Sequence, residues 1–416
     1  MVTLGAQWIV PISGEPIRNG FLTIDRDGRI KEISATGPKH ALSLGRVALL
    51  PALVNAHTHL ELSFLHGRVP RSDTFNDWVT TLMSQRRAST ADPAAPPILD
   101  SARRAIEQAR ASGTGLIGDV SNSLATVAVL RDVQMAAHVF HELTGFNLTD
   151  VAGRIAQARN FIDATSADGG DIRISLAPHA PYSVAPELFK AIRRDVDAHP
   201  NPVTTVHLGE SPQEIELLRA GTGPVRVMLE RLGVWTDAWQ PPGGSPVTYL
   251  ADLEFLDART LVVHGVQFDS HDLARLRAIG ATLVSCPRSN VHVGVGSPPL
   301  EAFYDSGVEV AFGTDSLASV ADLNMFNELA EARRIAPRVP ARRLLQSATR
   351  TGARALGFEH DFGSIEVGKC AAFAAVRMPP RRVPDVEEYL VSGIDPDAIR
   401  WFDARRFGSS GIDVKE

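Results

Sequence analysis

The chain has 416 residues, of which 44% are hydrophobic and 22% are charged. This composition excludes an intrinsically disordered protein and is sufficient for a large buried core. The 42 basic residues against 48 acidic ones give a net charge of −6, so the basic excess that binds nucleic acid backbones is missing. We therefore expect a small-molecule substrate and no nucleic acid partner, and a homodimer is the assembly left open.

Cysteine and hydrophobic patterns bear on the cellular compartment. Cys286 and Cys370 are the two cysteines, too few for a disulfide framework or an all-cysteine zinc site. The first residues lack a basic region followed by an apolar stretch of signal length, and no uncharged run approaches about 18 residues. We expect a cytoplasmic protein without a membrane partner.

Short β-type runs and turn signals fill the first 50 residues and predict hairpins. From residue 52 to 358 the pattern changes to β-rich runs that alternate with helical ones, such as the helix predicted by the spacing of Leu99, Ala102, Ile106 and Ala109. The runs that predict strands are ALLPALVNAHTHL, TGLIGDVS, AAHVFHELTGF, DIRISLAPHAPYS, PVTTVHLGE, TLVVHGVQ, ATLVSCPRSN and VEVAFGTDS.

Eight strands, each followed by a helix, predict an α/β protein of the (β/α)₈ TIM barrel class over residues 52–358. Strand and turn patterns return after this region. We therefore expect residues 1–51 and 359–416 to form one small β-sandwich domain from both chain ends. The segment after about residue 380 has no clear pattern. In such barrels the active site lies at the carboxyl ends of the strands.

Five potential metal ligands stand at predicted strand ends. His57 and His59 are two residues apart in the first strand, so both imidazoles face one side. His207, His264 and Asp315 end later strands. Nitrogen and oxygen ligands of this kind suit zinc or iron(II). The alternative for a single histidine is an exposed or hydrogen-bonded core side chain.

Glu210 follows His207 by three residues, at the start of a predicted helix. A carboxyl group there could take a proton from a metal-activated water and pass it to a substrate nitrogen. The alternative is a solvated acid that the helix dipole favours.

Together, the HxH pair, the HxxE segment, the later histidine and the GTDS aspartate resemble the amidohydrolase superfamily over residues 5–375. The resemblance implies a metal held by His57, His59, His207 and Asp315, with His264 contacting the attacking water or a second metal. Many two-metal members of the superfamily bridge their ions with a carboxylated lysine on the fourth barrel strand. Of the five lysines here, only Lys190 lies in the predicted barrel, within a helix pattern. We therefore expect one divalent metal ion, zinc first and iron(II) second, as in the mononuclear deaminase and chlorohydrolase branch.

Three further residues are expected to bind the substrate. His179 lies in PHAPYS, a segment that resembles deaminases of S-adenosylhomocysteine and related nucleosides. The alternative is a histidine that the two flanking prolines hold for turn geometry alone. Glu61 could accept hydrogen bonds from a ribose or base, or be a rim carboxylate. Trp78 could stack on a purine or pack its loop. The segments around the HxH pair, FNDWVTTL, SCPRSN and GTDSLAS are most similar to aminodeoxyfutalosine deaminases. Arg288 in SCPRSN could be structural.

These features predict a hydrolytic deaminase of a 6-aminopurine nucleoside, with aminodeoxyfutalosine favoured over S-adenosylhomocysteine and methylthioadenosine. Glu210, His264 and Asp315 are the expected catalytic residues. The alternatives are a hydrolase of triazines or of another heterocycle such as guanine or cytosine, and a non-catalytic metal-binding barrel. The GxGxxG match at Gly113–Gly118 is rejected as a dinucleotide site because it precedes a strand instead of following one.

Overall fold

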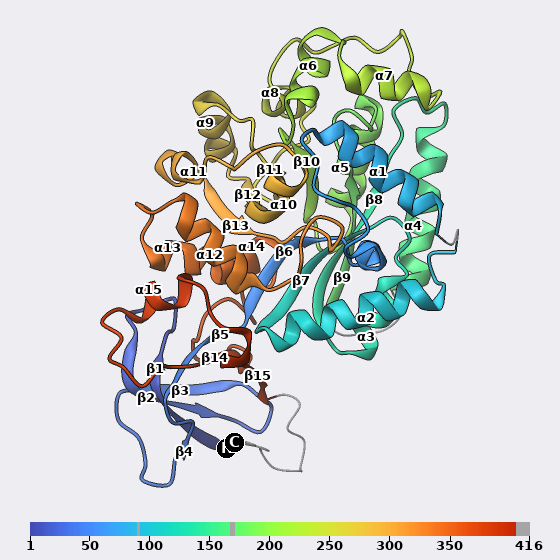
Figure 1. Cartoon of the computed structure of the whole chain (residues 1–416). Coiled ribbons are helices and arrows are strands. Elements are labelled where there is room, and N and C mark those ends of the chain that lie inside the picture. Colours follow the sequence, from blue (N-terminus) through green and yellow to red (C-terminus); the bar gives the residue numbers. More distant parts are fainter. Residues whose placement is uncertain (90–91, 167–170, 405–416) are drawn as a thin grey trace. The chain divides into compact units, whose positions relative to one another are not determined.

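The computed structural model describes residues 1–89, 92–166 and 171–404. The described chain divides into two compact units, whose helices and strands are labelled in Figure 1. Unit 1 comprises Met1–Asn55, Glu107–Leu116 and the described residues from Asn324 onward, and unit 2 comprises Ala56–Ile106 and Ile117–Leu323. None of the helices in the described ranges has the length and apolar character needed to cross a bilayer.

Strands from both chain ends form one seven-stranded mixed sheet with the order β15-β14-β5-β1-β2-β3, in which β4 also pairs with β1 (Figure 1). These strands are β1 (Val2–Ile9), β2 (Ile17–Ile24), β3 (Ile30–Ser34), β4 (Leu42–Ser43), β5 (Val47–Pro51), β14 (Ala372–Arg377) and β15 (Ile399–Asp403). The prediction that the two chain ends share a small β structure is confirmed. Its described strands join in this single sheet instead of the two separate sheets expected of a sandwich.

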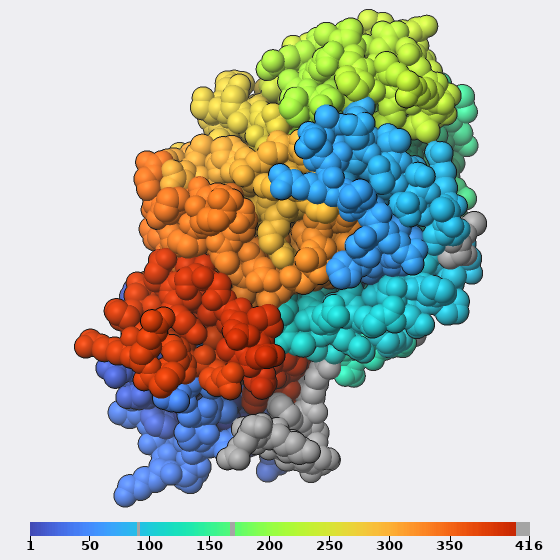
Figure 2. All heavy atoms as spheres, viewed as in Figure 1, coloured from blue at the N-terminus to red at the C-terminus, as the bar shows by residue number. Residues whose placement is uncertain are grey.

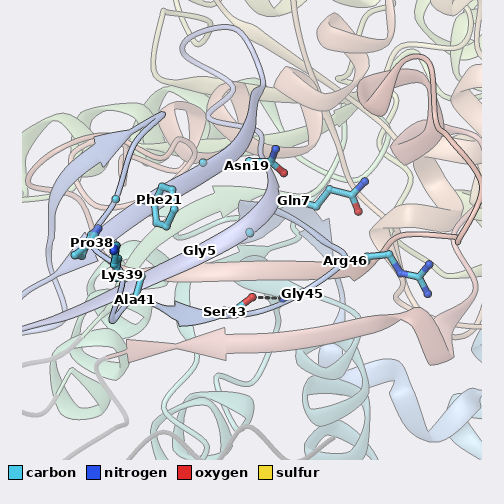
Figure 3. A pocket seen from close by; sticks show the side chains of 13 residues that line it. Gly5, Gln7, Asn19, Phe21, Pro38, Lys39, Ala41, Ser43, Gly45 and Arg46 are labelled. Atoms are coloured by element: carbon cyan, nitrogen blue, oxygen red, sulfur yellow. Dashed lines mark hydrogen bonds between the residues drawn. The ribbon is translucent and has the colours of Figure 1, made fainter.

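Alternating burial explains this sheet. In β2 the inward positions Gly20, Leu22 and Ile24 are buried and the residues between them are half-buried, as expected when one face packs on a core. The other face carries a shallow pocket where the Phe21 ring lies against Gly5 (Figure 3). A Cβ added to Gly37 would lie 2.2 Å from the same ring, so only glycine fits there.

The remaining strands form two four-stranded sheets with the orders β6-β7-β8-β9 and β10-β11-β12-β13. They are β6 (Leu53–Thr58), β7 (Thr114–Ser121), β8 (Ala136–Leu143), β9 (Ile172–Pro178), β10 (Thr204–Leu208), β11 (Thr260–His264), β12 (Thr282–Ser285) and β13 (Glu309–Phe312). The pairs β8–β9, β10–β11, β11–β12 and β12–β13 are parallel. All eight predicted strands are present, and six of them are buried at every position, as parallel strands covered on both faces are.

The first predicted run is two strands instead of one, because the chain leaves β5 of the mixed sheet at Pro51 and enters β6 at Leu53. The helices through residue 306 are η1 (Leu60–Leu65), α1 (Phe75–Arg87), α2 (Pro96–Ala111), α3 (Thr126–Asp132), α4 (Val151–Thr165), α5 (Pro186–Ala198), α6 (Pro212–Ala220), α7 (Pro224–Arg231), α8 (Pro246–Asp252), α9 (Ser270–Ile279), α10 (Pro287–His292) and α11 (Leu300–Ser306). Those after residue 324 are α12 (Met325–Ile335), α13 (Ala341–Gln346), η2 (Ser347–Thr351), α14 (Gly352–Ala355), α15 (Val386–Val391) and η3 (Pro396–Ala398).

Candidate active site

The predicted ligand residues converge within unit 2. His57 lies in β6, His207 in β10 and His264 at the end of β11, and one ring nitrogen from each lies within 4.8 Å of the other two. His59 and Asp315 form a second such group with His57. Strand ends therefore bring together five side chains that are far apart in the sequence.

The spacing of the donor atoms fits a single ion. His59 Nε2 lies 3.3 Å from His207 Nε2, and Asp315 Oδ1 lies 3.7 Å from His59 Nε2 and 3.9 Å from His57 Nε2. Nitrogen and oxygen ligands about 2.1 Å from one tetrahedral ion would be about 3.4 Å apart. The buried imidazoles of His57 and His207 and the half-buried imidazole of His59 can therefore hold a metal ion with small adjustments.

The backbone at this site adopts unusual conformations. His264 has a φ of 79° and Asp315 a φ of 62°, in the left-handed region that residues other than glycine rarely occupy. Each costs on the order of 1–3 kcal/mol and is typical of functional sites. Gly313 also allows a close approach, since a Cβ there would lie 2.7 Å from the His57 carbonyl oxygen.

Hydrogen bonds fix the Asp315 carboxylate. Its Oδ2 accepts from the Ser289 hydroxyl at 2.7 Å, and its Oδ1 accepts from the backbone N–H of Ser316 at 2.7 Å. The backbone N–H of Asp315 donates to the His57 carbonyl at 3.0 Å, and the Thr58 hydroxyl donates to the Asp315 carbonyl at 2.8 Å. Hydrogen bonds to the side chain and to the backbone of Asp315 thus hold its carboxylate beside the imidazoles.

Two imidazoles are oriented by their second nitrogens. His207 Nδ1 donates to the backbone carbonyl of His179 at 3.0 Å, which leaves the lone pair of Nε2 toward the cluster. His264 Nδ1 lies 3.0 Å from the Asn290 amide nitrogen. The His264 Nε2 atom therefore faces the cavity, where it lies 3.6 Å from Glu210 Oε1.

Burial sets the protonation states of the cluster. Desolvation lowers the pKa of His57 and of His264 well below the ordinary value, with neighbouring imidazoles adding to the effect. Desolvation also lowers the pKa of His207 and of His179 to about 4. Neutral imidazoles keep the lone pairs that bind metal ions. Desolvation raises the pKa of Asp315.

Glu210 is buried beside His264, and Glu214 holds its backbone. The Glu214 carboxylate accepts from the backbone N–H groups of Gly209 at 2.9 Å and of Glu210 at 3.1 Å. Desolvation first, and then the charges of Asp315 and Glu214, raise the pKa of Glu210 well above its usual value. The site therefore contains a buried carboxyl group that is suited to proton transfer.

A cavity of about 610 Å³ opens on this cluster. Its floor is defined here as His59, His207, Glu210, His264 and Asp315, all of which line it. Its outer wall is defined as Val79 and Met83 of α1, Met228 and Leu229 of α7, and Leu232, which follows α7. On the face shown in Figure 2, the blue atoms of the α1 region adjoin the yellow-green atoms of the region that contains α7.

Two of the three predicted substrate-binding residues line the cavity. Trp78 is buried and stacks on Phe75 with ring centroids 6.5 Å apart. His179 lies against Tyr182, and its Nδ1 is 2.7 Å from the Ser183 hydroxyl. Both can reach a bound molecule, and their contacts with a substrate stay a prediction.

Glu61 is placed differently. Its carboxylate accepts hydrogen bonds from the hydroxyls of Ser121 and Ser123, both at 2.8 Å, and from the backbone N–H groups of Asn122 and Ser123, both at 3.2 Å. Arg86 adds a contact of 3.4 Å, and Glu61 is not among the residues that line the described cavity. The carboxylate fastens the turn after β7, and a role in binding substrate stays a prediction.

Several residues of the site carried no assignment from sequence. Glu142, at the end of β8, lines the cavity, and Asn122, directly after β7, hydrogen-bonds to it. Ser289 and Asn290 orient Asp315 and His264. The strand-end rule applied to β7 and β8 would have found Asn122 and Glu142, whereas the partners in SCPRSN carry no such signal.

Three other sequence features are now placed. The Gly113–Gly118 segment follows α2 and enters β7, the reverse of the order that a dinucleotide site needs. Lys190 is exposed on α5, where it cannot bridge two metals at the strand ends. Arg288 donates to the Asp322 carboxylate at 3.0 Å and to the Asp322 carbonyl at 2.8 Å, which is a structural contact.

Comparison with known proteins assigns the family. Residues 48–395 match the model of the amidohydrolase family. The chain is 30% identical over 352 residues to aminodeoxyfutalosine deaminase of Deinococcus radiodurans, covering 80% of this chain and 79% of that protein. It is 29% identical over 395 residues to a 5-methylthioadenosine/S-adenosylhomocysteine deaminase of Halobacterium salinarum, covering 90% of this chain and 84% of that protein.

Solved structures agree in fold. An adenosine deaminase of Xanthomonas campestris with bound zinc has a TM-score of 0.82 at 25% identity and covers 97% of this chain and 92% of its own. Aminofutalosine deaminase of Helicobacter pylori in complex with methylthio-coformycin has a TM-score of 0.84 at 22% identity and covers 97% and 99%. The resemblance found in the sequence motifs is confirmed. The chain therefore belongs to the amidohydrolase family, as a metal-dependent deaminase that acts on carbon–nitrogen bonds.

Proposed function

We propose that the chain hydrolytically deaminates a 6-aminopurine nucleoside, with aminodeoxyfutalosine as the first candidate and methylthioadenosine and S-adenosylhomocysteine next. The supporting observation is the cavity in which three neutral imidazoles, Asp315 and Glu210 meet at the floor. Its volume of about 610 Å³ lies within the range of about 300–1,000 Å³ that is usual for small-molecule sites. The names of the relatives support the same substrate class.

The cluster fits one zinc ion, with iron(II) as the alternative. His57, His59, His207 and Asp315 would hold it, and the zinc-bound relative supports this choice. When bound, the ion supplies a Lewis acid that makes water more acidic. Exposed Lys190 supports one ion instead of a lysine-bridged pair.

The protein groups would then move the protons. Asp315 and His264 orient the attacking water, and Asp315 accepts its proton. The Glu210 carboxyl donates a proton to the purine ring nitrogen next to the carbon that bears the amine, so that attack at this carbon does not leave a full negative charge on the ring. The proton held by Asp315 then passes to the leaving amine and the proton of the new hydroxyl returns to Glu210, so the carbon–nitrogen bond breaks, the carbonyl forms and ammonia leaves. Burial of Glu210 beside His264 supports this role.

The same proposal includes a barrel that closes at two seams. Hydrogen bonds from His207 to His179 and from Asp315 to His57 span the edges of the two four-stranded sheets. They support one (β/α)₈ barrel over residues 52–358, with residues 1–51 and 359–416 as a second domain. A closed barrel would place all eight strand ends around one mouth.

The test is a substrate panel with the zinc-loaded protein. Ammonia release is measured from aminodeoxyfutalosine, methylthioadenosine, S-adenosylhomocysteine, adenosine, guanine and cytosine, and chloride release from a chlorotriazine. We expect kcat/KM to be highest for one of the purine nucleosides. Preferred turnover of a free base or of the triazine would contradict the proposal, and full metal occupancy without any turnover would favour a non-catalytic barrel.

A further inference from the structure

Glu142 is a buried carboxylate at the cavity that the proposed reaction does not use. It lies at the end of β8 and is 6% exposed. It lines the cavity, and one of its oxygens lies within 4.8 Å of ring nitrogens of His179 and His207. A carboxylate in such a place needs donors for both oxygens.

The two carboxylate oxygens of Glu142 differ in their partners. Oε2 accepts from the Asn122 side-chain amide at 2.9 Å, and the same amide lies 3.3 Å from the Glu142 backbone carbonyl. Oε1 is buried and accepts no hydrogen bond from any residue in the described part of the chain. An acceptor left without a donor in this way costs about 1–3 kcal/mol, so a bound ligand that supplies a donor would recover it.

The nearby histidine does not satisfy Oε1. His207 Nδ1 lies 3.5 Å from it, but the proton on that nitrogen is directed to the His179 carbonyl at 3.0 Å. The other nitrogen of His207 lies 3.3 Å from His59 Nε2, in the metal cluster. Both nitrogens of His207 are therefore engaged, and Glu142 is required neither to orient this ring nor to form a second metal site with it.

Asn122 holds the carboxylate ready for a ligand. Its backbone N–H donates to Glu61 at 3.2 Å, and its side-chain oxygen lies 3.4 Å from two guanidinium nitrogens of Arg86. With the amide oxygen facing Arg86, the amide nitrogen must face Glu142. The geometry of Glu142 is thus fixed by a chain of polar contacts that begins on α1 and does not include the substrate.

The charges around the cavity restrict the kind of donor. Arg86 and Arg154 line the same cavity as Glu142, so a ligand ammonium group would be repelled by two cations. The exocyclic amine of an adenine-type base belongs at the floor beside Glu210, where it reacts. A neutral sugar hydroxyl is the donor that remains in a nucleoside.

We propose that Glu142 Oε1 accepts a hydrogen bond from a ribose hydroxyl of the substrate and so makes the enzyme select ribonucleosides over deoxynucleosides. The inference rests on the proposed nucleoside deamination. A hydrogen bond between a hydroxyl and a carboxylate contributes about 1.5–3 kcal/mol, so loss of the right hydroxyl should lower kcat/KM about 10- to 150-fold.

The test compares adenosine-type substrates with their 2′-deoxy and 3′-deoxy counterparts in the wild type, Glu142→Gln and Glu142→Ala. In Glu142→Gln the side-chain oxygen must accept from Asn122, which turns the NH₂ group toward the cavity and removes the acceptor. Glu187→Gln, which changes an exposed carboxylate on α5 away from the cavity, is the matched control.

We expect one deoxy substrate to be about 10- to 150-fold poorer for the wild type and for Glu187→Gln. In both Glu142 variants the ribose and deoxyribose forms should be turned over nearly equally, with the loss confined to the ribose form and the zinc content unchanged. An undiminished ribose preference in Glu142→Gln, or a loss of zinc, would overturn the inference.

Calorimetric titration with the same nucleosides separates this inference from the proposed function. If the wild type deaminates ribose and both deoxyribose forms equally, the role of Glu142 is wrong while the function stands. If no nucleoside is deaminated, the function is wrong, and a hydroxyl-dependent affinity that Glu142→Gln removes would still support Glu142. Absence of both turnover and binding would overturn both.

Discussion

The floor of the cavity and its outer wall are built in different ways. Of the floor residues, His264 ends β11 and Asp315 follows β13 by three residues; both are nearly inaccessible and are held by hydrogen bonds from Asn290 and Ser289. Wall residues such as Met83 and Leu232 belong to a helix or a helix end and are 37% and 49% exposed. We therefore expect the chemistry to depend on the rigid floor and the fit of the substituent on the sugar to depend on the more exposed wall.

The largest effect should come from the floor. Glu210→Gln removes the proton donor but keeps the volume of the side chain and leaves the neighbouring His264 unchanged. We therefore expect kcat to fall about 10²- to 10⁴-fold. Metal content, measured by elemental analysis, should not change. Glu187→Gln serves as control, and turnover within twofold of the wild type for Glu210→Gln would rule out this role.

A second test concerns the support beneath the floor. The Asp119 carboxylate accepts a hydrogen bond of 2.8 Å from the backbone N–H of Leu60, the residue that follows His59. Desolvation raises the pKa of Asp119 from 3.8 to about 7. Its neutral form is favoured in the folded state, so the stability it contributes is full below pH 3.8 and is lost as the pH rises through 7.

Between pH 5 and 8 the wild type should therefore lose roughly 3 kcal/mol of unfolding free energy relative to Asp119→Asn. Urea denaturation of both proteins at each pH measures this difference. Asp100→Asn, which changes an exposed carboxylate on α2, should follow the wild type. Parallel pH profiles for the wild type and Asp119→Asn would contradict the assigned pKa.

A third prediction concerns a hydrogen bond that supports the expected metal ligand Asp315 from a residue that is not itself a ligand. Ser289→Ala deletes the hydrogen bond of 2.7 Å to Asp315 Oδ2. Removal of such a supporting partner weakens metal binding about 10- to 100-fold. Competition with a zinc chelator gives the affinity. An unchanged zinc affinity would show that the backbone N–H of Ser316 is enough to hold the carboxylate.

The smallest effect should come from the wall. Met228→Ala removes part of an apolar surface that would contact the substituent on the sugar, at a cost of about 1–2 kcal/mol in binding. KM for methylthioadenosine should rise about 5- to 30-fold at similar kcat, while KM for adenosine should change less. Equal changes for both substrates would show that the wall does not discriminate between them.

The same contrast explains what could be predicted from the sequence. His57 and Asp315 carry their signal in short motifs at strand ends, and the alternation of strands and helices placed those ends correctly. Glu61 lies in η1, which begins at Leu60, and its carboxylate contacts Ser121 and Ser123, a contact that no sequence motif indicates.

Other features depend on tertiary contacts that leave no local pattern. Ser289 reaches Asp315 across 26 residues, and Asn122 joins Glu61 to Glu142. The wall combines residues of α1 with residues in and just after α7, and no periodic pattern in either segment predicts that both line one cavity. The mixed sheet likewise depends on pairing between β5 and β14, which are more than 300 residues apart. The strand and turn patterns at the two chain ends predict a shared β structure but do not predict which residues pair.

Anomalous diffraction at the zinc edge from crystals of the zinc-loaded protein tests the central claim most directly. We predict a single peak about 2.0–2.2 Å from ring nitrogens of His57, His59 and His207 and from an oxygen of Asp315. Two peaks at this site, or a peak that these four side chains do not coordinate, would contradict the account.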